Sequence, residues 1–181
     1  MNVKSEKGFS YIEVMVAMVI LLVGILALLS GISGAVLQSR GQEQQLMARH
    51  LAATAMESIM AVKETDPTRM GWNAVGNVGS NPINGVPQGI FVTGRRNVMT
   101  NAGPDEVIGT ADDNGAVVPG YQRQIVITDQ CDPDRPSPNC PTPGTANVRI
   151  RLVEVTVFYF VGRMQRQEQL TTVLSDYAVT E

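Results

Sequence analysis

A single acidic residue, Glu13, stands at the start of a long apolar run. The sixteen residues from Val14 to Leu29 contain no charged or strongly polar side chain, and the next charge along the chain is Arg40. A carboxylate beside hydrocarbon is costly unless a cation pairs with it. The position therefore predicts either an oppositely charged partner for Glu13 or a place at the polar boundary of the apolar run.

A second group of side chains with potential chemistry lies in the glycine-rich stretch from Asn101 to Gly115. Carboxylate and amide oxygens are concentrated there, and oxygen ligands in a turn suit a hard cation such as calcium. The spacing does not fit an EF-hand, and a solvated acidic turn is the alternative. The expected calcium ligands are Asp105, Asp112 and Asp113.

Two cysteines, Cys131 and Cys140, enclose a short proline-rich loop. Their closeness, in a chain that also carries an apolar segment, predicts one disulfide in an oxidising compartment, with two free thiols as the alternative. The loop would either be exposed and carry partner contacts or serve only as a staple. Their spacing is wrong for zinc, and the only histidine, His50, is far away in sequence.

Catalytic motifs do not support an enzyme. The chain has no phosphate-binding glycine loop followed by a lysine, no Gly-x-Ser-x-Gly elbow and no metal triad. The net charge of −3 provides no basic field for a nucleic acid. We therefore expect a protein that acts by packing and pairing rather than by chemistry.

The apolar run continues to Leu37 and is long enough to cross a membrane. As a helix, Val14 to Leu37 would extend about 36 Å, against a hydrocarbon core of about 30 Å. Lys4 and Lys7 precede it, so the positive-inside rule places the N-terminus in the cytoplasm and the rest outside. A secretory signal cut near Ala35 is the alternative, although the run is long for a signal core. We expect a transmembrane span at about residues 12–37.

The helical pattern continues beyond the membrane and becomes amphipathic, which predicts one helix over residues 9–62. Residues 63–119 are rich in turn formers, with one short strand expected at 89–93. Strands are expected at 121–129, 147–161 and 167–177, giving an antiparallel sheet packed on the helix. The predicted apolar stripe comprises Met47, Leu51, Ala55, Ile59 and Val62. In the 147–161 strand, five residues are predicted to lie largely on the face opposite the Val and Ile side chains: Arg149, Arg151, Glu154, Thr156 and Phe158.

The sequence Lys7-Gly8-Phe9-Ser10-Tyr11-Ile12-Glu13-Val14 resembles the class III signal of type IV pilins and pseudopilins. That signal is a short basic leader ending in Gly, then Phe, then Glu at the fifth mature position and about twenty apolar residues. Tyr11 stands where Leu is common. The helix around residues 47–59 is weakly similar to that of PilV-type minor pilins, and the acidic loop resembles short calcium loops of some major pseudopilins.

The resemblance implies the pilin fold: an α+β architecture with a long N-terminal helix packed on a small antiparallel sheet. A prepilin peptidase would remove a leader of residues 1–8 by cutting between Gly8 and Phe9, and the amine of Phe9 would be N-methylated. Glu13 would then lie one helical turn from Phe9 and could pair with the Phe9 ammonium of a neighbouring subunit. Residues 63–181 would form the globular head.

The function expected from this resemblance is that of a minor type IV pilin of the PilV type, a subunit that is incorporated into or initiates a pilus. Its partners would be other minor pilins, the major pilin, the peptidase and the inner-membrane assembly platform. The head would be periplasmic before assembly and on the surface pilus afterwards, in adhesion or motility. A minor pseudopilin of a type II secretion system and a membrane-anchored periplasmic binding module are the alternatives.

Overall fold

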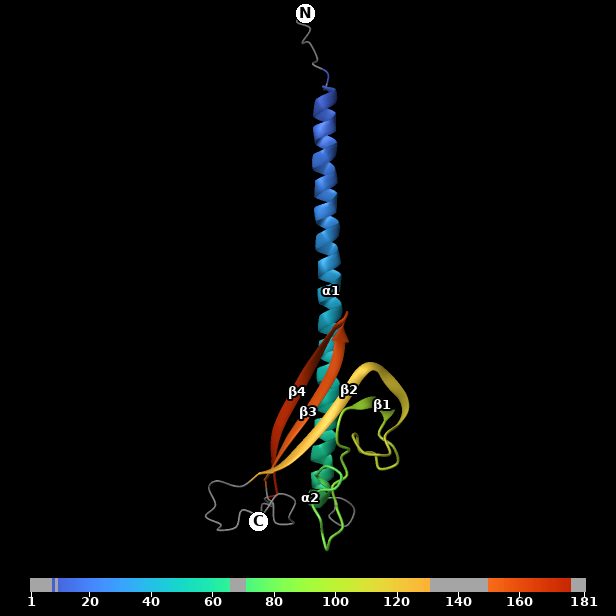
Figure 1. The fold of residues 1–181 in the computed structure, drawn as a ribbon, viewed down its shortest axis with the longest axis vertical. Coiled ribbons are helices and arrows are strands. Elements are labelled where there is room, and N and C mark those ends of the chain that lie inside the picture. The colour runs from blue at the N-terminus through green and yellow to red at the C-terminus, as the bar shows by residue number, and fades with distance from the viewer. Residues whose placement is uncertain (1–7, 9, 66–70, 131–149, 177–181) are drawn as a thin grey trace, which may run out of the picture. The chain divides into compact units, whose positions relative to one another are not determined.

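The computed structural model describes residues 8, 10–65, 71–130 and 150–176. The chain divides into two compact units, Met1–Gln42 and Glu43–Glu181. Along the chain, the elements are α1 (Tyr11–Glu64), α2 (Gly71–Ala74), β1 (Arg96–Asn101), β2 (Asn114–Gln130), β3 (Ile150–Val161) and β4 (Met164–Ser175) (Figure 1). The long N-terminal helix and the antiparallel sheet confirm the predicted α+β pilin fold.

Helix α1 begins directly after Ser10, whose carbonyl accepts hydrogen bonds from the N–H groups of Glu13 (3.0 Å) and Val14 (3.3 Å). No proline interrupts its 54 residues. Every side chain of the first unit's helical part is exposed, and the large apolar ones up to Leu37 are each at least 42% exposed. Within its own unit this helix therefore buries nothing, and its apolar surface requires lipid or other chains.

The part of α1 in the second unit buries one face against the sheet. Three of the six buried side chains on that face are alanines, which lets the strands approach the helix backbone closely there. Met47, predicted to lie on the stripe, is 39% exposed, because the buried face is centred on Ala48 and Ala52 instead. The buried helix residues are Ala48, Ala52, Ala55, Met56, Ile59 and Val62.

The sheet has the order β1-β2-β3-β4, and all neighbouring strands are antiparallel. Gly162 and Arg163 form the two-residue turn between β3 and β4, and Gly162 has a φ of 62°, which favours glycine. Strand β1 was not predicted. The strand expected at 89–93 was wrong, since Phe91 makes only a single-residue bridge to Asn77.

The long segment between α1 and β1 is fixed by an asparagine side chain. Asn77 donates from Nδ2 to the Ile125 carbonyl (3.0 Å), and its Oδ1 accepts the Ile127 N–H (2.8 Å). An amide side chain presents the same donor and acceptor as a peptide group, so Asn77 substitutes for a neighbouring strand along β2. This explains how a turn-rich segment holds one conformation without strands of its own.

Arg151 contradicts the predicted strand pattern. It was expected on the face away from the apolar β3 side chains, but it is 1% exposed and lies on the buried face with Val153 and Val155. Its guanidinium donates to Asp129 Oδ1 (3.1 Å), to the Val75 carbonyl (2.7 Å) and to the Trp72 carbonyl. Burial is possible because these acceptors satisfy the charge, and they tie α2 and its following turn to the sheet.

Candidate functional site

Glu13 lies in the first turn of α1 and is exposed. In the part of the chain that the structure describes, its carboxylate has no hydrogen bond or ion pair. Gly8 is exposed, whereas Phe9 lies outside the described residues, so the predicted cleavage and methylation remain predictions. Ser10 and Glu13 also have the spacing of a helix capping box, but in the described part of the chain the Glu13 carboxylate makes no hydrogen bond to the Ser10 N–H.

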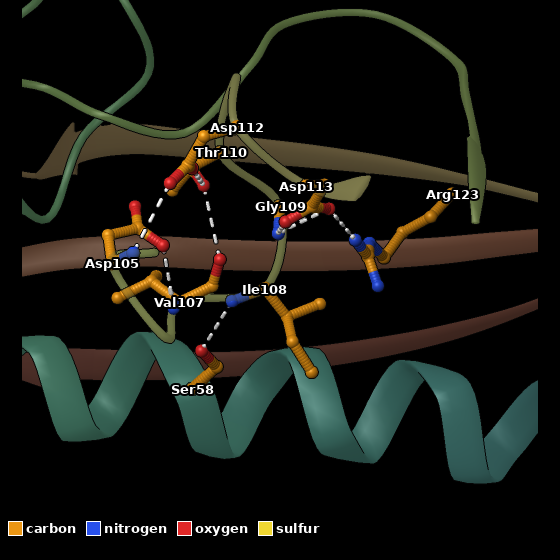
Figure 2. Close-up of polar contacts among 9 residues, drawn as sticks. All are labelled: Ser58, Asp105, Val107, Ile108, Gly109, Thr110, Asp112, Asp113 and Arg123. Atoms are coloured by element: carbon orange, nitrogen blue, oxygen red, sulfur yellow. Dashed lines mark hydrogen bonds and ion pairs between the residues drawn. The ribbon is translucent and has the colours of Figure 1, made fainter. Parts of the chain in front are cut away.

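The acidic loop between β1 and β2 is a compact network rather than a solvated turn (Figure 2). Asp113 accepts hydrogen bonds from the Gly109 N–H at 3.1 and 3.0 Å and pairs with Arg123 at 3.0 Å. The Arg123 side chain is 7% exposed and that of Asp113 is 13% exposed. This buried pair fixes the end of the loop to β2.

Asp105 and Asp112 organise the remainder of the loop. Asp105 Oδ1 accepts the Val107 N–H (2.8 Å), and Asp112 Oδ2 accepts the Asp105 N–H (3.2 Å). The Thr110 hydroxyl donates to Asp112 Oδ1 at 2.6 Å. Asp105 and Asp112 are therefore neighbours, whereas the Asp113 carboxylate faces Gly109 and Arg123, and each of the three predicted ligands accepts a hydrogen bond from the loop itself.

Sequence reasoning missed two residues that hold this loop in place. The Ser58 hydroxyl of α1 accepts the Ile108 N–H at 2.9 Å, which links the loop to the helix (Figure 2). Arg123 forms the ion pair from β2. The sequence held a clue to Arg123, because strand alternation puts it on the same face as Ile125, which is buried. No sequence pattern indicates Ser58.

The pKa values of the adjacent carboxyl groups of Asp112 and Asp113 are shifted in opposite directions. The hydrogen bond from Thr110 lowers the pKa of Asp112 below its ordinary 3.8, against a smaller effect of burial. Burial raises the pKa of Asp113 above 3.8 and outweighs the opposing Gly109 N–H and Arg123 guanidinium. The same burial lowers the pKa of Arg123. We attribute the direction at Asp113 to its enclosure, since an exposed Asp–Arg pair would shift the opposite way.

The pKa shifts of Asp112 and Asp113 make the free energy of unfolding depend on pH in opposite directions. The folded state favours ionised Asp112, so this contribution to stability is complete above 3.8 and is lost as pH falls through the folded-state pKa. The folded state favours protonated Asp113, so that contribution is present below 3.8 and is lost as pH rises through its folded-state pKa.

Asp112→Asn is expected to lower the unfolding free energy at neutral pH but to match the wild type in acid well below 3.8. Asparagine preserves the shape of Asp112 and one of its two acceptor oxygens but removes the titrating charge. Urea unfolding of the full chain in detergent, followed by Trp72 fluorescence at a series of pH values, measures the difference. Thr110→Val should make the unfolding free energy change less with pH, because it removes the hydrogen bond that lowers the pKa of Asp112. If wild type and Asp112→Asn differ in unfolding free energy by the same amount at every pH, the assignment of this pH-dependence to Asp112 is refuted.

The acidic loop, as it lies, does not fit a calcium ion. In the described parts of the chain, no group of three or more His, Cys, Asp and Glu side chains could hold a metal ion. Asp113 already has the Gly109 N–H and Arg123 as partners. Calcium binding at Asp105, Asp112 and Asp113, which the sequence pattern indicated, would require the Asp113 carboxylate to exchange these partners for the ion.

Calcium at about 1 mM, the range used by extracellular modules, is expected to leave the unfolding midpoint of the full chain unchanged. The physical reason is that the carboxylates are already satisfied by donors of the protein. Thermal unfolding in detergent with calcium and with a chelator measures this. A calcium-dependent rise that disappears in Asp112→Asn would instead establish the predicted cation site.

Cys131 and Cys140 lie outside the described residues, and their disulfide stays a prediction. Helix α1 is long and apolar enough to cross a membrane: its most apolar 18-residue window has a mean hydropathy of 2.9 and is 0% buried. Length and composition alone do not separate a membrane span from a signal sequence, so the N-terminal motif decides how this helix is interpreted.

Comparison with known proteins supplies that motif. Residues 3–29 match the family model described as the prokaryotic N-terminal methylation motif. The match confirms the predicted class III signal, shared by type IV pilins and pseudopilins, and with α1 it fits membrane anchoring. No curated protein matches the chain significantly, and neither does any solved structure. The matched residues include residues 3–8 of the predicted leader, Glu13 and the first two thirds of the apolar segment, and none of the head.

Proposed function

We propose that this chain, which carries the N-terminal methylation motif of pilin-like proteins, is a minor type IV pilin of the PilV type. It would wait in the inner membrane with its head in the periplasm. It would then join other minor pilins and the major pilin at the assembly platform, for a role in adhesion or motility. In this proposal the protein is a structural subunit and not an enzyme.

The observation that carries the proposal is the motif at residues 3–29 on a helix that buries none of its apolar window. A plain anchor needs an apolar helix but has no use for an acidic residue in a fixed register with a cleavage site. A subunit that leaves the membrane must replace lipid with other helices. The apolar surface from Val14 to Leu37 suits both environments.

Glu13 supplies the proposed specificity of that packing. Once Gly8 is removed, the Phe9 amine is a cation one helical turn from Glu13. In a bundle of apolar helices, an unpaired carboxylate is costly and a paired one is tolerated. Pairing of Glu13 with the Phe9 ammonium of a neighbour would thus select one stagger between subunits.

A minor pseudopilin of a type II secretion system is the second candidate, because it carries the same N-terminal motif. Deletion of the coding sequence, followed by complementation, separates the two functions. The pilin proposal predicts loss of surface pili from the sheared fraction with normal protein secretion, and presence of the complementing chain in that fraction. Intact pili with impaired secretion would favour the pseudopilin instead.

A further inference from the structure

The turn that joins β3 to β4 exposes apolar and basic side chains together. We define the hairpin tip as residues 160–166. Phe160 is 50% exposed and Met164 is 62% exposed, and Arg163 and Arg166 are exposed as well. Neither Phe160 nor Met164 belongs to the hydrophobic core of the head, so the apolar surface of both side chains is available for contact outside the chain.

The strand register distributes these side chains over both faces of the tip. Val161 pairs with Met164, and Phe160 pairs with Gln165. Since successive side chains alternate between faces, Phe160 and Met164 point to opposite sides of the sheet. Arg163 stands in the turn between them. A tip that is apolar on both sides with a cation at its apex suits insertion into a surface better than lateral packing.

Contacts within the second unit show which way the tip points. Glu168 accepts a hydrogen bond from Gln45 at 2.7 Å and pairs with Arg49 at 2.9 Å. Leu174, later in β4, is buried in the same core as Val62 near the end of α1. Strand β4 thus runs in the same sense as the helix, and the tip lies beyond Gln45, toward Glu43. Figure 1 shows this turn at the end of the sheet opposite α2.

Chain connectivity keeps that end of the second unit near a membrane. Only five residues separate Leu37, the last of the apolar segment, from Glu43. Even fully extended, five residues and their flanking bonds span about 20 Å. When the apolar segment spans a bilayer, the Glu43 end of the second unit must lie within that distance of the membrane surface, whatever the arrangement of the two units.

We propose that the hairpin tip docks on the outer surface of the inner membrane, with Phe160 and Met164 in the interfacial layer and Arg163 and Arg166 on anionic phospholipid headgroups. The inference requires the apolar segment to span the membrane and is independent of which filament the chain joins. Apolar side chains such as Phe can bury at the boundary between headgroups and acyl chains, and basic ones are attracted to anionic lipid. Glu43 is the acidic residue at this end, while Glu168 is neutralised by Arg49.

The test places a tryptophan at the tip of the full chain reconstituted in vesicles. Phe160→Trp is measured in equal parts of phosphatidylglycerol and acyl-brominated phosphatidylcholine, and its emission is compared with that of the wild type, which reports buried Trp72 alone. Val173→Trp is the matched control, since Val173 is 61% exposed on the same face of the sheet but at the opposite end. We expect blue-shifted, bromine-quenched emission from position 160 and no quenching at position 173.

Charge reversal tests the lipid contact itself. Arg163→Glu with Arg166→Glu is expected to weaken docking at least about thirtyfold, which corresponds to about 1 kcal/mol for each arginine near an anionic surface. Quenching at position 160 that does not differ from position 173, in chains that resist carbonate extraction, would overturn the inference. That result would leave the pilin proposal intact, because extraction and processing of the N-terminus are measured separately.

Discussion

Glu13→Ala is expected to leave the chain in the membrane, cut after Gly8, and to remove it almost completely from the sheared pilus fraction. The variant loses the carboxylate that would pair with the Phe9 ammonium of a neighbour. Removing one partner of a buried pair costs about 3–5 kcal/mol, so incorporation should fall roughly a hundredfold or more. Immunoblots of the sheared and membrane fractions, with intact mass for processing, measure the outcome.

A second substitution separates pairing from helix capping. Glutamine preserves the hydrogen-bonding role of a capping box but carries no charge. If the charge is what matters, Glu13→Gln fails to assemble as Glu13→Ala does. Glu57→Ala is the matched control, because Glu57 is an exposed acid on the same helix, and it should assemble normally. Wild-type levels of Glu13→Ala in the pilus fraction would show that assembly does not depend on the Glu13 carboxylate.

Arg151→Ala is expected to cause the largest loss of stability in the head. The substitution removes a donor to Asp129 and to the carbonyls of Trp72 and Val75, and it removes the guanidinium that lies 4.2 Å from the Trp72 ring centre. Breaking a buried pair costs about 3–5 kcal/mol, which should lower the midpoint of thermal unfolding by about 10 °C or more. Trp72 fluorescence and near-ultraviolet circular dichroism in detergent follow the transition.

Two further variants test whether the buried contacts of the Arg151 guanidinium cause this loss of stability. Arg151→Lys preserves the charge but cannot reach three acceptors in one plane, so an intermediate loss is expected. Arg95→Ala is the control, since Arg95 stacks on Phe158 at 3.5 Å from the ring centre but is exposed. It should cost only about 0.5–1 kcal/mol. Equal losses for Arg151→Ala and Arg95→Ala would show that the buried contacts do not stabilise the head.

The long helix and three of the four strands could be predicted because their patterns are strong and local. The apolar run and the absence of proline determine α1, and alternating Val and Ile residues determine β3. Glu13 was singled out in the same way, since a charge is conspicuous among apolar residues, and its role in assembly stays a prediction. The helix stripe was nearly right, but close packing selected Ala48 and Ala52 over the larger Met47, which hydrophobicity alone favours.

What could not be predicted depends on partners distant in sequence. Arg151 is buried only because Asp129, Trp72 and Val75 converge on it from other elements. Strand β1 has an ordinary composition and forms because its backbone pairs with the edge of β2. The acidic loop was correctly singled out as unusual. Its carboxylates, however, accept hydrogen bonds from the backbone and from Thr110 and pair with Arg123, and a one-dimensional pattern of acids cannot show those donors.

The most direct test of the central claim is the intact mass and N-terminal sequence of the protein purified from its native membrane. The account predicts a chain that starts at an N-methylated Phe9, because the motif at residues 3–29 would be processed before assembly. A chain that starts at Met1 would contradict processing and leave an anchored module. A chain cut near Ala35 would contradict it more severely, because Glu13 and the apolar segment would be absent from the mature protein.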